Sequence, residues 1–213
     1  RRTGRIVRAL NNVLAFPVQQ SLKPDIVHET YYAPRRQAPR KAYTVVTVFD
    51  MIHEKFPDSF TGLDRTRYHK RAAIKRADHI VCISDNTRQD LIELLGIQPE
   101  RTSRIYLGHH LDRCGNLDTG DPIGRPYLLF VGLRQGYKNF SALVEAYAAS
   151  EKLRQDFILV AFGGGAFTHD ERRKIHRLGL AQDSVIQLSG SDTLLALLYD
   201  HALMFICPSK YEG

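Results

Sequence analysis

The sequence predicts an α/β protein made of two doubly wound units, each with a parallel sheet covered by helices. Three observations support this fold class. Short apolar runs alternate with amphipathic segments along most of the 213 residues. Runs such as Tyr127–Val131 are apolar without polar alternation, which is typical of strands covered on both faces. The stretch from Gly108 to Pro126 is rich in Gly, Asp and Pro and shows no periodicity, so it is predicted to join two units.

The distribution of charge indicates the same boundary. Residues 1–120 contain 20 Lys and Arg against 13 Asp and Glu, so they account for the whole formal net charge of +7, whereas residues 121–213 are neutral. We therefore expect an N-terminal domain over 1–108, a linker over 109–126 and a C-terminal domain over 127–213. The sequence begins with Arg rather than Met and ends inside a motif, so we expect a truncated chain in which both domains are incomplete.

The individual elements follow from the periodicity of the apolar residues. Eight apolar runs predict strands, at Asp25–Glu29, Tyr43–Phe49, His79–Ser84, Arg104–Leu107, Tyr127–Gly132, Phe157–Phe162, Ser184–Leu188 and Leu203–Cys207. Six amphipathic segments predict helices, at Gly4–Phe16, Leu63–Arg76, Asn86–Leu95, Phe140–Ser150, Asp170–Leu178 and Thr193–His201. Ser84 or Asp85 is expected to cap the third helix and Gly96 to end it, while Asp192 is expected to cap the last one.

Composition disfavours several classes of function. The three cysteines have no zinc-like or disulfide-like spacing, so Cys82 and Cys207 are expected to be buried, reduced thiols of a cytoplasmic protein. No apolar stretch in the sequence is long enough to span a membrane. There is no Gly-x-Ser-x-Gly elbow, and no Asp-x-Asp pair that would hold a metal on a nucleotide sugar. Aromatic residues do not interleave with the basic residues, which disfavours nucleic acid as a partner.

A polar loop follows the first strand of the C-terminal half and is the first candidate site. The strand ends at Gly132, and a helix is expected to begin near Asn139. Backbone N–H groups at a helix start, together with Arg134 as a bidentate fork and Lys138 as a point charge, suit a diphosphate. An ordinary solvated loop containing two cations explains the same residues.

A glycine-rich segment follows the next strand. Gly163, Gly164 and Gly165 would permit close approach of the backbone to a ligand, and a tight turn explains them equally well. The spacing fits neither a Walker loop nor a dinucleotide fingerprint.

The loop before the last helix is a third candidate. Ser189, Gly190 and Asp192, with Leu194 in the following helix, are predicted to bind substrate, through main-chain groups that could read the edge of a nucleobase. A plain capped turn is the alternative.

Two further groups of residues have carboxylates after an apolar run. Glu212, followed by Gly213, could accept hydrogen bonds from sugar hydroxyls, or it could be a surface carboxylate. Asp50, His53 and Glu54 follow an apolar run in the N-terminal half, where they could line an interdomain cleft or form a satisfied loop cluster.

A basic helical stretch runs from Arg65 to Arg76. It contains six cations interrupted by Ala72, Ala73 and Ile74. Such a helix can lie on an anionic membrane surface, and a solvated helix face is the alternative.

Taken in order, the segments resemble bacterial family 4 retaining glycosyltransferases with the two-domain, Rossmann-like B-type fold. The matching stretches are Asp25–Tyr32, Thr47–Pro57, Arg76–Ser84, Phe130–Asn139, Gly163–Gly165 and Pro208–Gly213. They cover nearly the whole chain from about Asp25. The variants around the two tyrosines and the Asp-Met-Ile-His-Glu segment are most similar to enzymes that extend surface polysaccharide or O-antigen, often with mannose or rhamnose.

The resemblance implies roles for several residues. Arg134 and Lys138 match the cations on the donor diphosphate, and Glu212 matches the first of two glutamates, which contacts the donor sugar. The loop 189–192 matches the one that touches the base. The family usually has His where this chain has Phe49, beside Asp50. Because Phe cannot donate a hydrogen bond, either Asp50 or His53 compensates or activity is lost.

The resulting expectation is a metal-independent retaining hexosyltransferase without a cofactor. It would move a hexose such as mannose from a nucleotide sugar, for example GDP-mannose, to a growing surface polysaccharide or lipid-linked glycan. A catalytically impaired module that binds a nucleotide sugar or a partner enzyme is the alternative. We expect a cytoplasmic protein that associates peripherally with the inner face of the bacterial plasma membrane through 65–76 and assembles with other polysaccharide-synthesis enzymes.

Overall fold

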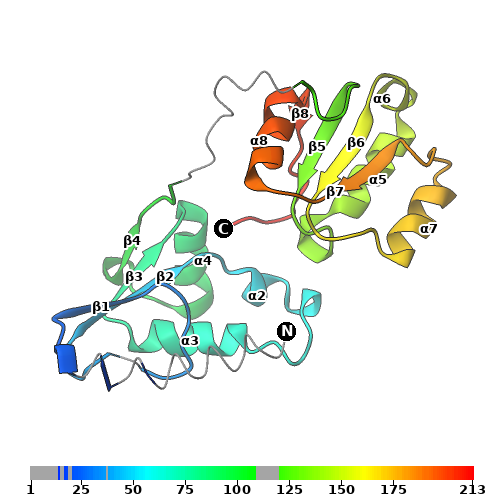
Figure 1. The fold of residues 1–213 in the computed structure, drawn as a ribbon. Coiled ribbons are helices and arrows are strands. Elements are labelled where there is room, and N and C mark those ends of the chain that lie inside the picture. Colours follow the sequence, from blue (N-terminus) through cyan, green and yellow to red (C-terminus); the bar gives the residue numbers. More distant parts are fainter. Residues whose placement is uncertain (1–13, 15–16, 19–20, 37, 109–119) are drawn as a thin grey trace. The chain divides into compact units, whose positions relative to one another are not determined.

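The computed structural model describes residues 14, 17–18, 21–36, 38–108 and 120–213 (Figure 1). The chain divides into two compact units, one of residues 1–108 with 212–213 and one of residues 109–211. The helix predicted over Gly4–Phe16 falls almost entirely outside the described residues. Within the described part of the chain, no helix is both long enough and apolar enough to cross a membrane.

The first unit contains a four-stranded parallel sheet in the order β1-β2-β3-β4. Its elements are β1 (Ile26–Glu29), β2 (Tyr43–Val48), α2 (Ile52–Lys55), α3 (Thr66–Arg76), β3 (His79–Cys82), α4 (Asp85–Leu95) and β4 (Thr102–Arg104), with short 3-10 turns at Pro57–Ser59 and Pro99–Arg101. Its core forms where Val48 and Cys82, both fully buried and opposite each other in register, meet Ile74 of α3 and Leu91 of α4.

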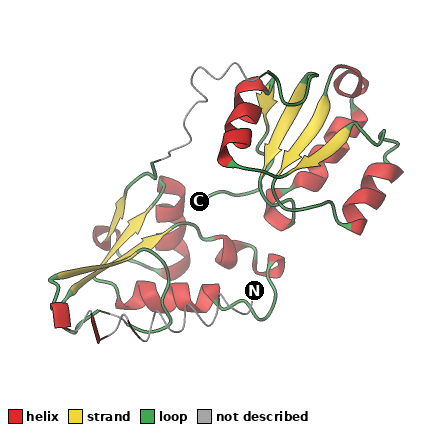
Figure 2. Cartoon of the chain, in the orientation of Figure 1, coloured by secondary structure: helices red, strands yellow, loops and turns green. Residues whose placement is uncertain are grey.

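The second unit contains another four-stranded parallel sheet, in the order β7-β6-β5-β8 (Figure 2). Its elements are β5 (Tyr127–Val131), a 3-10 turn (Gly136–Lys138), α5 (Phe140–Ala149), α6 (Glu151–Asp156), β6 (Ile158–Phe162), α7 (His169–Arg177), β7 (Val185–Leu188), α8 (Asp192–His201) and β8 (Met204–Phe205). These two sheets with their helices confirm the predicted α/β fold class.

Strand β5 shows why apolar runs without alternation mark this architecture. Leu128 and Phe130 belong to the core cluster formed with α5 and α7, whereas Tyr127 and Leu129 belong to the cluster formed with α8. Both faces of the strand are therefore covered, and each side chain from Tyr127 to Phe130 is buried. Buried Tyr127 satisfies its hydroxyl by donating a hydrogen bond to the carbonyl of Leu198, at 2.8 Å.

Several expected elements differ from the structure. The fourth strand is Thr102–Arg104 rather than Arg104–Leu107, because buried Thr102 pairs with Ile80 while Ile105, which comes after the strand, is 58% exposed. Helices α2 and α6 were not predicted, since each is shorter than two turns.

Two predictions about single residues near the chain's end are wrong. Ser191, not Asp192, caps α8, because the Ser191 hydroxyl accepts a hydrogen bond from the Leu194 amide. Cys207 is exposed rather than buried, since β8 ends before it at Phe205. Cys82 is buried as expected, and burial raises the pKa of its thiol to about 11. Ser84 caps α4 and Gly96 ends it in the left-handed conformation, as predicted.

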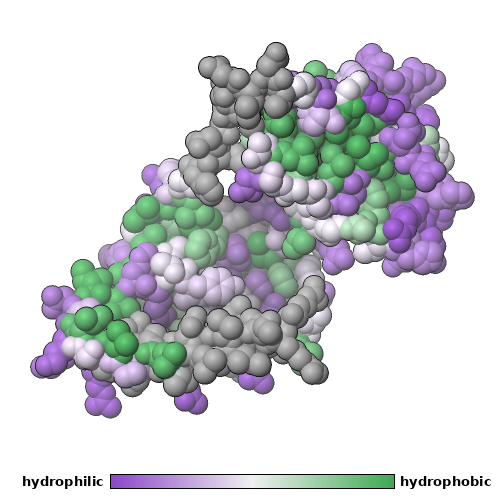
Figure 3. All heavy atoms as spheres, in the orientation of Figure 1, coloured by the Kyte–Doolittle hydropathy of each residue, from purple (hydrophilic) through white to green (hydrophobic). Residues whose placement is uncertain are grey.

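The surface of the second unit is divided by polarity. Figure 3 shows apolar residues gathered on one face of this unit and hydrophilic residues along another part of its surface. Exposed apolar side chains in this unit include Leu203, Met204 and Phe205 at β8. The hydrophilic side chains include those of α7, in which six of nine residues from His169 to Arg177 are exposed.

Candidate functional site

Four loops leave the carboxyl ends of the strands in the second unit, and they contain most of the predicted site residues. Parallel pairing places these ends at one edge of the sheet. Backbone hydrogen bonds continue beyond the strands: the Gly132 amide donates to the Phe162 carbonyl, and the Gly163 amide donates to the Leu188 carbonyl, both at 2.9 Å. The loops after β5, β6 and β7 are therefore held side by side.

Arg134 lies inside this group of loops. Its side chain is 2% exposed, and Nε donates to Oε1 of Glu171 at 2.8 Å. Nη1 donates to the Gly163 carbonyl at 2.8 Å, and Nη2 donates to the carbonyls of Gly165 and Ala166 at 3.0 and 3.1 Å. The guanidinium thus binds the glycine-rich loop and a carboxylate. The sequence had predicted a bidentate contact with phosphate instead.

The glycine-rich loop has a conformation that requires glycine. Gly163, Gly164 and Gly165 have φ values of +87°, +68° and +73°, where a side chain would be strained. A Cβ atom on Gly164 would also lie 2.8 Å from Nη1 of Arg134 and 3.0 Å from the carbonyl oxygen of Gly132. The three glycines thus permit the loop to fold tightly against Arg134.

Lys138 and Asn139 lie at the start of α5, as predicted. Asn139 occupies the N-cap position in the left-handed region, with φ of +56°, but its side chain does not cap the helix. Its Nδ2 donates instead to the Pro208 carbonyl at 3.1 Å, and the Lys210 amide donates to the Tyr137 carbonyl at 2.8 Å. The loop after β5 is therefore fastened to the loop after β8. Lys138 is half-buried, with Nζ 5.3 Å from the Tyr137 ring centroid.

The loop before α8 is exposed and compact. Ser189, Gly190 and Asp192 are exposed, while Leu194 is half-buried in the first turn of the helix. A Cβ atom on Gly190 would approach Cδ2 of Leu194 to 2.7 Å, so this glycine allows the backbone to pass the leucine. Base recognition here stays a prediction.

Glu212 follows buried Tyr211 and is exposed, and Gly213 is half-buried. An exposed carboxylate can accept hydrogen bonds from a sugar, and contact between Glu212 and the donor sugar stays a prediction.

In the first unit, the predicted cluster after β2 is organised by Lys70, one of the six cations in the basic stretch from Arg65 to Arg76. Lys70 of α3 is fully buried, and its Nζ donates to the Asp50 carbonyl at 2.7 Å and to Oε2 of Glu54 at 2.8 Å. Oδ1 of Asp50 lies 3.4 Å from the same nitrogen. The spacing of Lys70 from buried Ala73 and Ile74 places all three on one face of the helix, which is the signal that could have identified it.

His53 approaches the same carboxylate oxygen of Asp50 as Lys70, with its Nδ1 4.0 Å from Oδ1. Its ring stacks on Phe60 with centroids 3.9 Å apart, and Nε2 lies 3.4 Å from Oδ2 of Asp64. Hydrogen bonds from Thr66 hold the pKa of Asp64 below its ordinary value despite partial desolvation, and His53 contributes in the same direction. His53 is therefore placed by packing and by a carboxylate.

Phe49 stands where the resemblance implies His, and it lies next to two tyrosines. Its amide donates to the Tyr32 hydroxyl at 3.3 Å, and its ring centroid is 6.5 Å from that of Tyr31. Burial raises the pKa of the Tyr32 hydroxyl, partly offset by the hydrogen bond from Phe49. Because a neutral Tyr32 can donate a hydrogen bond, it supplies a polar hydrogen beside Phe49.

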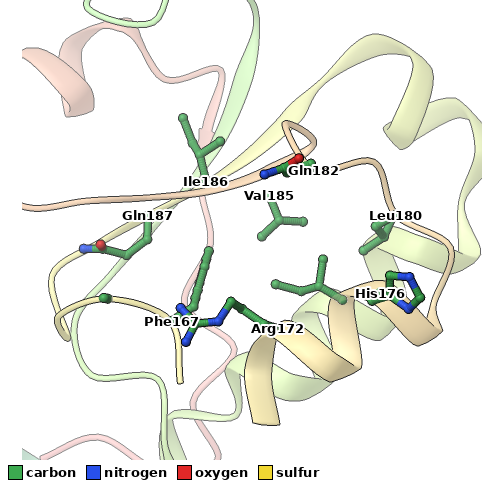
Figure 4. A pocket seen from close by; sticks show the side chains of 10 residues that line it. Phe167, Arg172, His176, Leu180, Gln182, Val185, Ile186 and Gln187 are labelled. Atoms are coloured by element: carbon green, nitrogen blue, oxygen red, sulfur yellow. The ribbon is translucent and has the colours of Figure 1, made fainter. Parts of the chain in front are cut away.

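A cavity of about 610 Å³ lies elsewhere in the second unit, between α7 and β7 (Figure 4). Its lining includes Phe167, Arg172, His176 and Val185, and no predicted site residue is among those that line it. Across the described residues, no group of three or more His, Cys, Asp or Glu side chains could hold a metal ion.

Comparison with known proteins assigns the chain to a family. Residues 2–113 match the family model described as Glycosyltransferase Family 4, and residues 118–213 match Glycosyl transferases group 1. The chain belongs to glycosyltransferase family 4. The resemblance read from the sequence motifs is thereby confirmed.

Individual relatives agree with this assignment. The chain is 26% identical over 223 residues to the serotype-specific mannosyltransferase WbdA of Escherichia coli, covering 91% of this chain and 27% of the relative. It is 30% identical over 157 residues to D-inositol 3-phosphate glycosyltransferase 2 of Catenulispora acidiphila, covering 66% of this chain and 36% of that protein. The chain therefore spans about a third of these curated relatives or less.

Solved structures support the B-type fold. WaaG, a glycosyltransferase involved in lipopolysaccharide biosynthesis, superimposes with a TM-score of 0.65 at 21% identity, over 92% of this chain and 56% of that one. Sucrose-phosphate synthase from Thermosynechococcus elongatus gives a TM-score of 0.63 at 20% identity, over 88% and 51%. At these identities the likeness shows the fold.

The buried charges of this family 4 chain predict a large effect for Lys70→Met. The substitution leaves Glu54, whose side chain is 2% exposed, without its cation, so we expect a loss of about 3–5 kcal/mol in the free energy of unfolding. Urea denaturation of the full chain measures it, with exposed Lys75→Met on the same helix as the control. The double variant Lys70→Met/Glu54→Gln should recover part of the loss. Equal stability of the Lys70 and Lys75 variants would contradict the assigned burial.

The pH dependence of stability tests the ion pair between Arg134 and Glu171. Burial by itself would raise the pKa of Glu171, but hydrogen bonds from Arg134 and Thr168 outweigh it and hold the pKa below 4.5. Because the folded pKa is lower than the unfolded one, the stabilisation is complete above pH 4.5 and is lost as pH falls through the folded pKa. The stability difference between the wild type and Glu171→Gln should therefore shrink in acid. A difference that is constant from neutral pH into acid would contradict it.

Proposed function

We propose that this chain is part of a retaining glycosyltransferase that moves a hexose, mannose or a similar sugar, from a nucleotide sugar to a surface polysaccharide or lipid-linked glycan. The observation that supports this most is the pair of neighbouring loops after β5 and β6 in a family 4 chain, which contain the three glycines, Lys138 and the start of α5. The mannosyltransferase WbdA and the lipopolysaccharide enzyme WaaG support the classes of sugar and acceptor.

The proposed reaction breaks the bond between the anomeric carbon and the diphosphate oxygen of the donor. The diphosphate leaves with the electron pair, an acceptor hydroxyl forms the new bond on the same face of the sugar, and the hydroxyl proton passes to the leaving phosphate. Lys138, the first amides of α5 and the amides of the glycine-rich loop would stabilise the charge that develops on the diphosphate. A metal ion is then not required. Glu212 would hold the sugar hydroxyls.

A second candidate is a module that binds a nucleotide sugar without turnover. The observation that favours it is Phe49, which replaces the family's usual His by a side chain that cannot donate a hydrogen bond. Under the first proposal, Asp50, His53 or the hydroxyl of Tyr32 next to Phe49 compensates.

We also propose peripheral attachment to an anionic membrane through α3. The stretch 65–76, which is α3 with its N-cap residue Arg65, contains six cations, and two of them are engaged inside the first unit: Lys70 is buried, and Nη2 of Arg76 lies 2.6 Å from Oε2 of Glu29. Arg65, Arg67, Arg71 and Lys75 are exposed and supply the surface for anionic lipid headgroups.

Removal of the Lys138 ammonium tests the catalytic proposal. Lys138→Ala should lower kcat about 10²–10³-fold with a smaller change in KM, because charge stabilisation is needed most in the transition state. Release of nucleoside diphosphate from GDP-, UDP- and dTDP-sugars would be measured with and without membranes that contain lipid-linked glycans. The control is Lys152→Ala, whose side chain is 85% exposed on α6. Turnover by Lys138→Ala at the wild-type rate would contradict the proposed mechanism. If the wild type binds nucleotide but shows no turnover, the binding module is favoured.

Vesicle flotation tests the membrane proposal. The chain should float with phosphatidylglycerol-containing vesicles and not with pure phosphatidylcholine. Changing Arg67, Arg71 and Lys75 together to Gln should abolish flotation, because each cation near the surface contributes roughly 1 kcal/mol. Three Arg→Gln changes on α7 serve as the charge-matched control. No preference for the anionic vesicles, or equal loss with the control, would contradict attachment through α3.

A further inference from the structure

The hydrogen bonds of Arg134 suggest a role different from direct contact with a ligand. We propose that Arg134 is a positioning residue: it binds the carbonyl side of the glycine-rich loop, and so directs amide groups of that loop toward the diphosphate of the donor. This inference rests on the proposed function and names how the second unit would recognise the diphosphate.

The guanidinium has almost no capacity left for a ligand. An arginine has five N–H donors. Nε and Nη1 each bind one acceptor, while Nη2 is within hydrogen-bond distance of the carbonyls of Gly165 and Ala166 and of Oε2 of Glu171. At most one N–H group remains, and it belongs to a side chain that is 2% exposed. A phosphate oxygen would have to displace these partners to reach Arg134.

The same hydrogen bonds fix the direction of the loop amides. In a planar trans peptide, the N–H group points away from the carbonyl of the same unit. The carbonyls of Gly163, Gly165 and Ala166 bind Arg134, so the amides of the residues that follow them, Gly164, Ala166 and Phe167, point away from the guanidinium. Among the described residues, no protein acceptor is recorded for these three amides. The amides of Ala166 and Phe167 are successive, and successive free amides form a concave site for anions.

Glu171 and Phe167 hold the guanidinium in place. Glu171 completes a capping box with Thr168 at the start of α7, in which the Thr168 amide donates to Oε2 of Glu171 at 2.7 Å. The Phe167 ring centroid lies 4.9 Å from Cζ of Arg134. The buried charge is thus balanced by a carboxylate that is itself fixed by a helix start, so the arrangement is rigid before a ligand binds.

Gly164→Ala tests whether the loop must fold tightly against Arg134, because it disturbs this packing and keeps both charges. The added Cβ would lie 2.8 Å from Nη1 of Arg134 and 3.0 Å from the Gly132 carbonyl oxygen, so the loop must move. Gly179→Ala is the matched control: Gly179 has the same φ of +68°, and nothing lies within 4 Å of its added Cβ. The two variants therefore share the backbone strain and differ in the clash with the Arg134 site.

The experiment is calorimetric titration of the full chain with GDP, UDP and dTDP, followed for the nucleotide that the wild type binds. Gly164→Ala and Arg134→Gln should each raise Kd about 10–100-fold, because a shift of about 1 Å in a binding group has effects of this size. Glu171→Gln should also weaken binding, since it loosens the guanidinium. Gly179→Ala should bind like the wild type, and thermal unfolding of each variant would verify folding.

Each alternative gives a different pattern. If Arg134 contacts the ligand directly, Glu171→Gln strengthens binding by freeing the cation, and that result would overturn the inference. Wild-type affinity in Gly164→Ala would overturn it too, whether or not Arg134→Gln binds weakly. These results leave the proposed function intact as long as the wild type binds a nucleotide. Failure of the wild type to bind any of the three nucleotides would overturn both.

Discussion

The ion pair between Arg134 and Glu171 connects the loop after β5 with the loop after β6 and the start of α7, which lie 29 to 37 residues further along the chain. Arg134 follows β5, the glycine carbonyls that it binds follow β6, and Glu171 begins α7. Burying a guanidinium is costly unless a carboxylate and hydrogen-bond acceptors surround it, and here both are present. The glycine-rich loop can keep its left-handed conformation because these carbonyls have a cation to bind.

The parallel sheet determines where this interaction forms. Strands β6 and β8 both pair with β5, so the loops after them lie on either side of the loop that contains Arg134 and Lys138. One neighbouring loop is bound by the guanidinium, and the other is fastened through Asn139 to the Pro208 carbonyl. The proposed diphosphate site is therefore built on a rigid sheet edge, where small errors of position have large catalytic effects.

The periodicity of apolar residues was sufficient to predict the fold class and most elements, because strands buried on both faces and amphipathic helices differ in spacing. It failed at Ile105–Leu107, an apolar run that stays exposed after β4 ends. It also failed for the short helices α2 and α6, since fewer than two turns give too few residues for a pattern.

The sequence was sufficient to predict which residues lie in the site, but it did not predict where their side chains point. Sequence placed Arg134 in the correct loop, yet a charged residue after a strand can point to solvent or inward, and Glu171, its partner 37 positions away, gave no local signal. Lys70 could have been recognised, because its spacing from Ala73 and Ile74 puts it on the buried face of α3. Contacts between distant residues are what the sequence alone does not provide.

A crystal structure of the chain with a bound nucleoside diphosphate tests this account most directly. We expect the diphosphate on the amides of Gly164, Ala166 and Phe167 and near the Lys138 ammonium, with Arg134 still bonded to Glu171 and the loop carbonyls. A guanidinium that has left Glu171 to bind the phosphates, or a nucleotide bound away from the loops after β5 and β6, would contradict it.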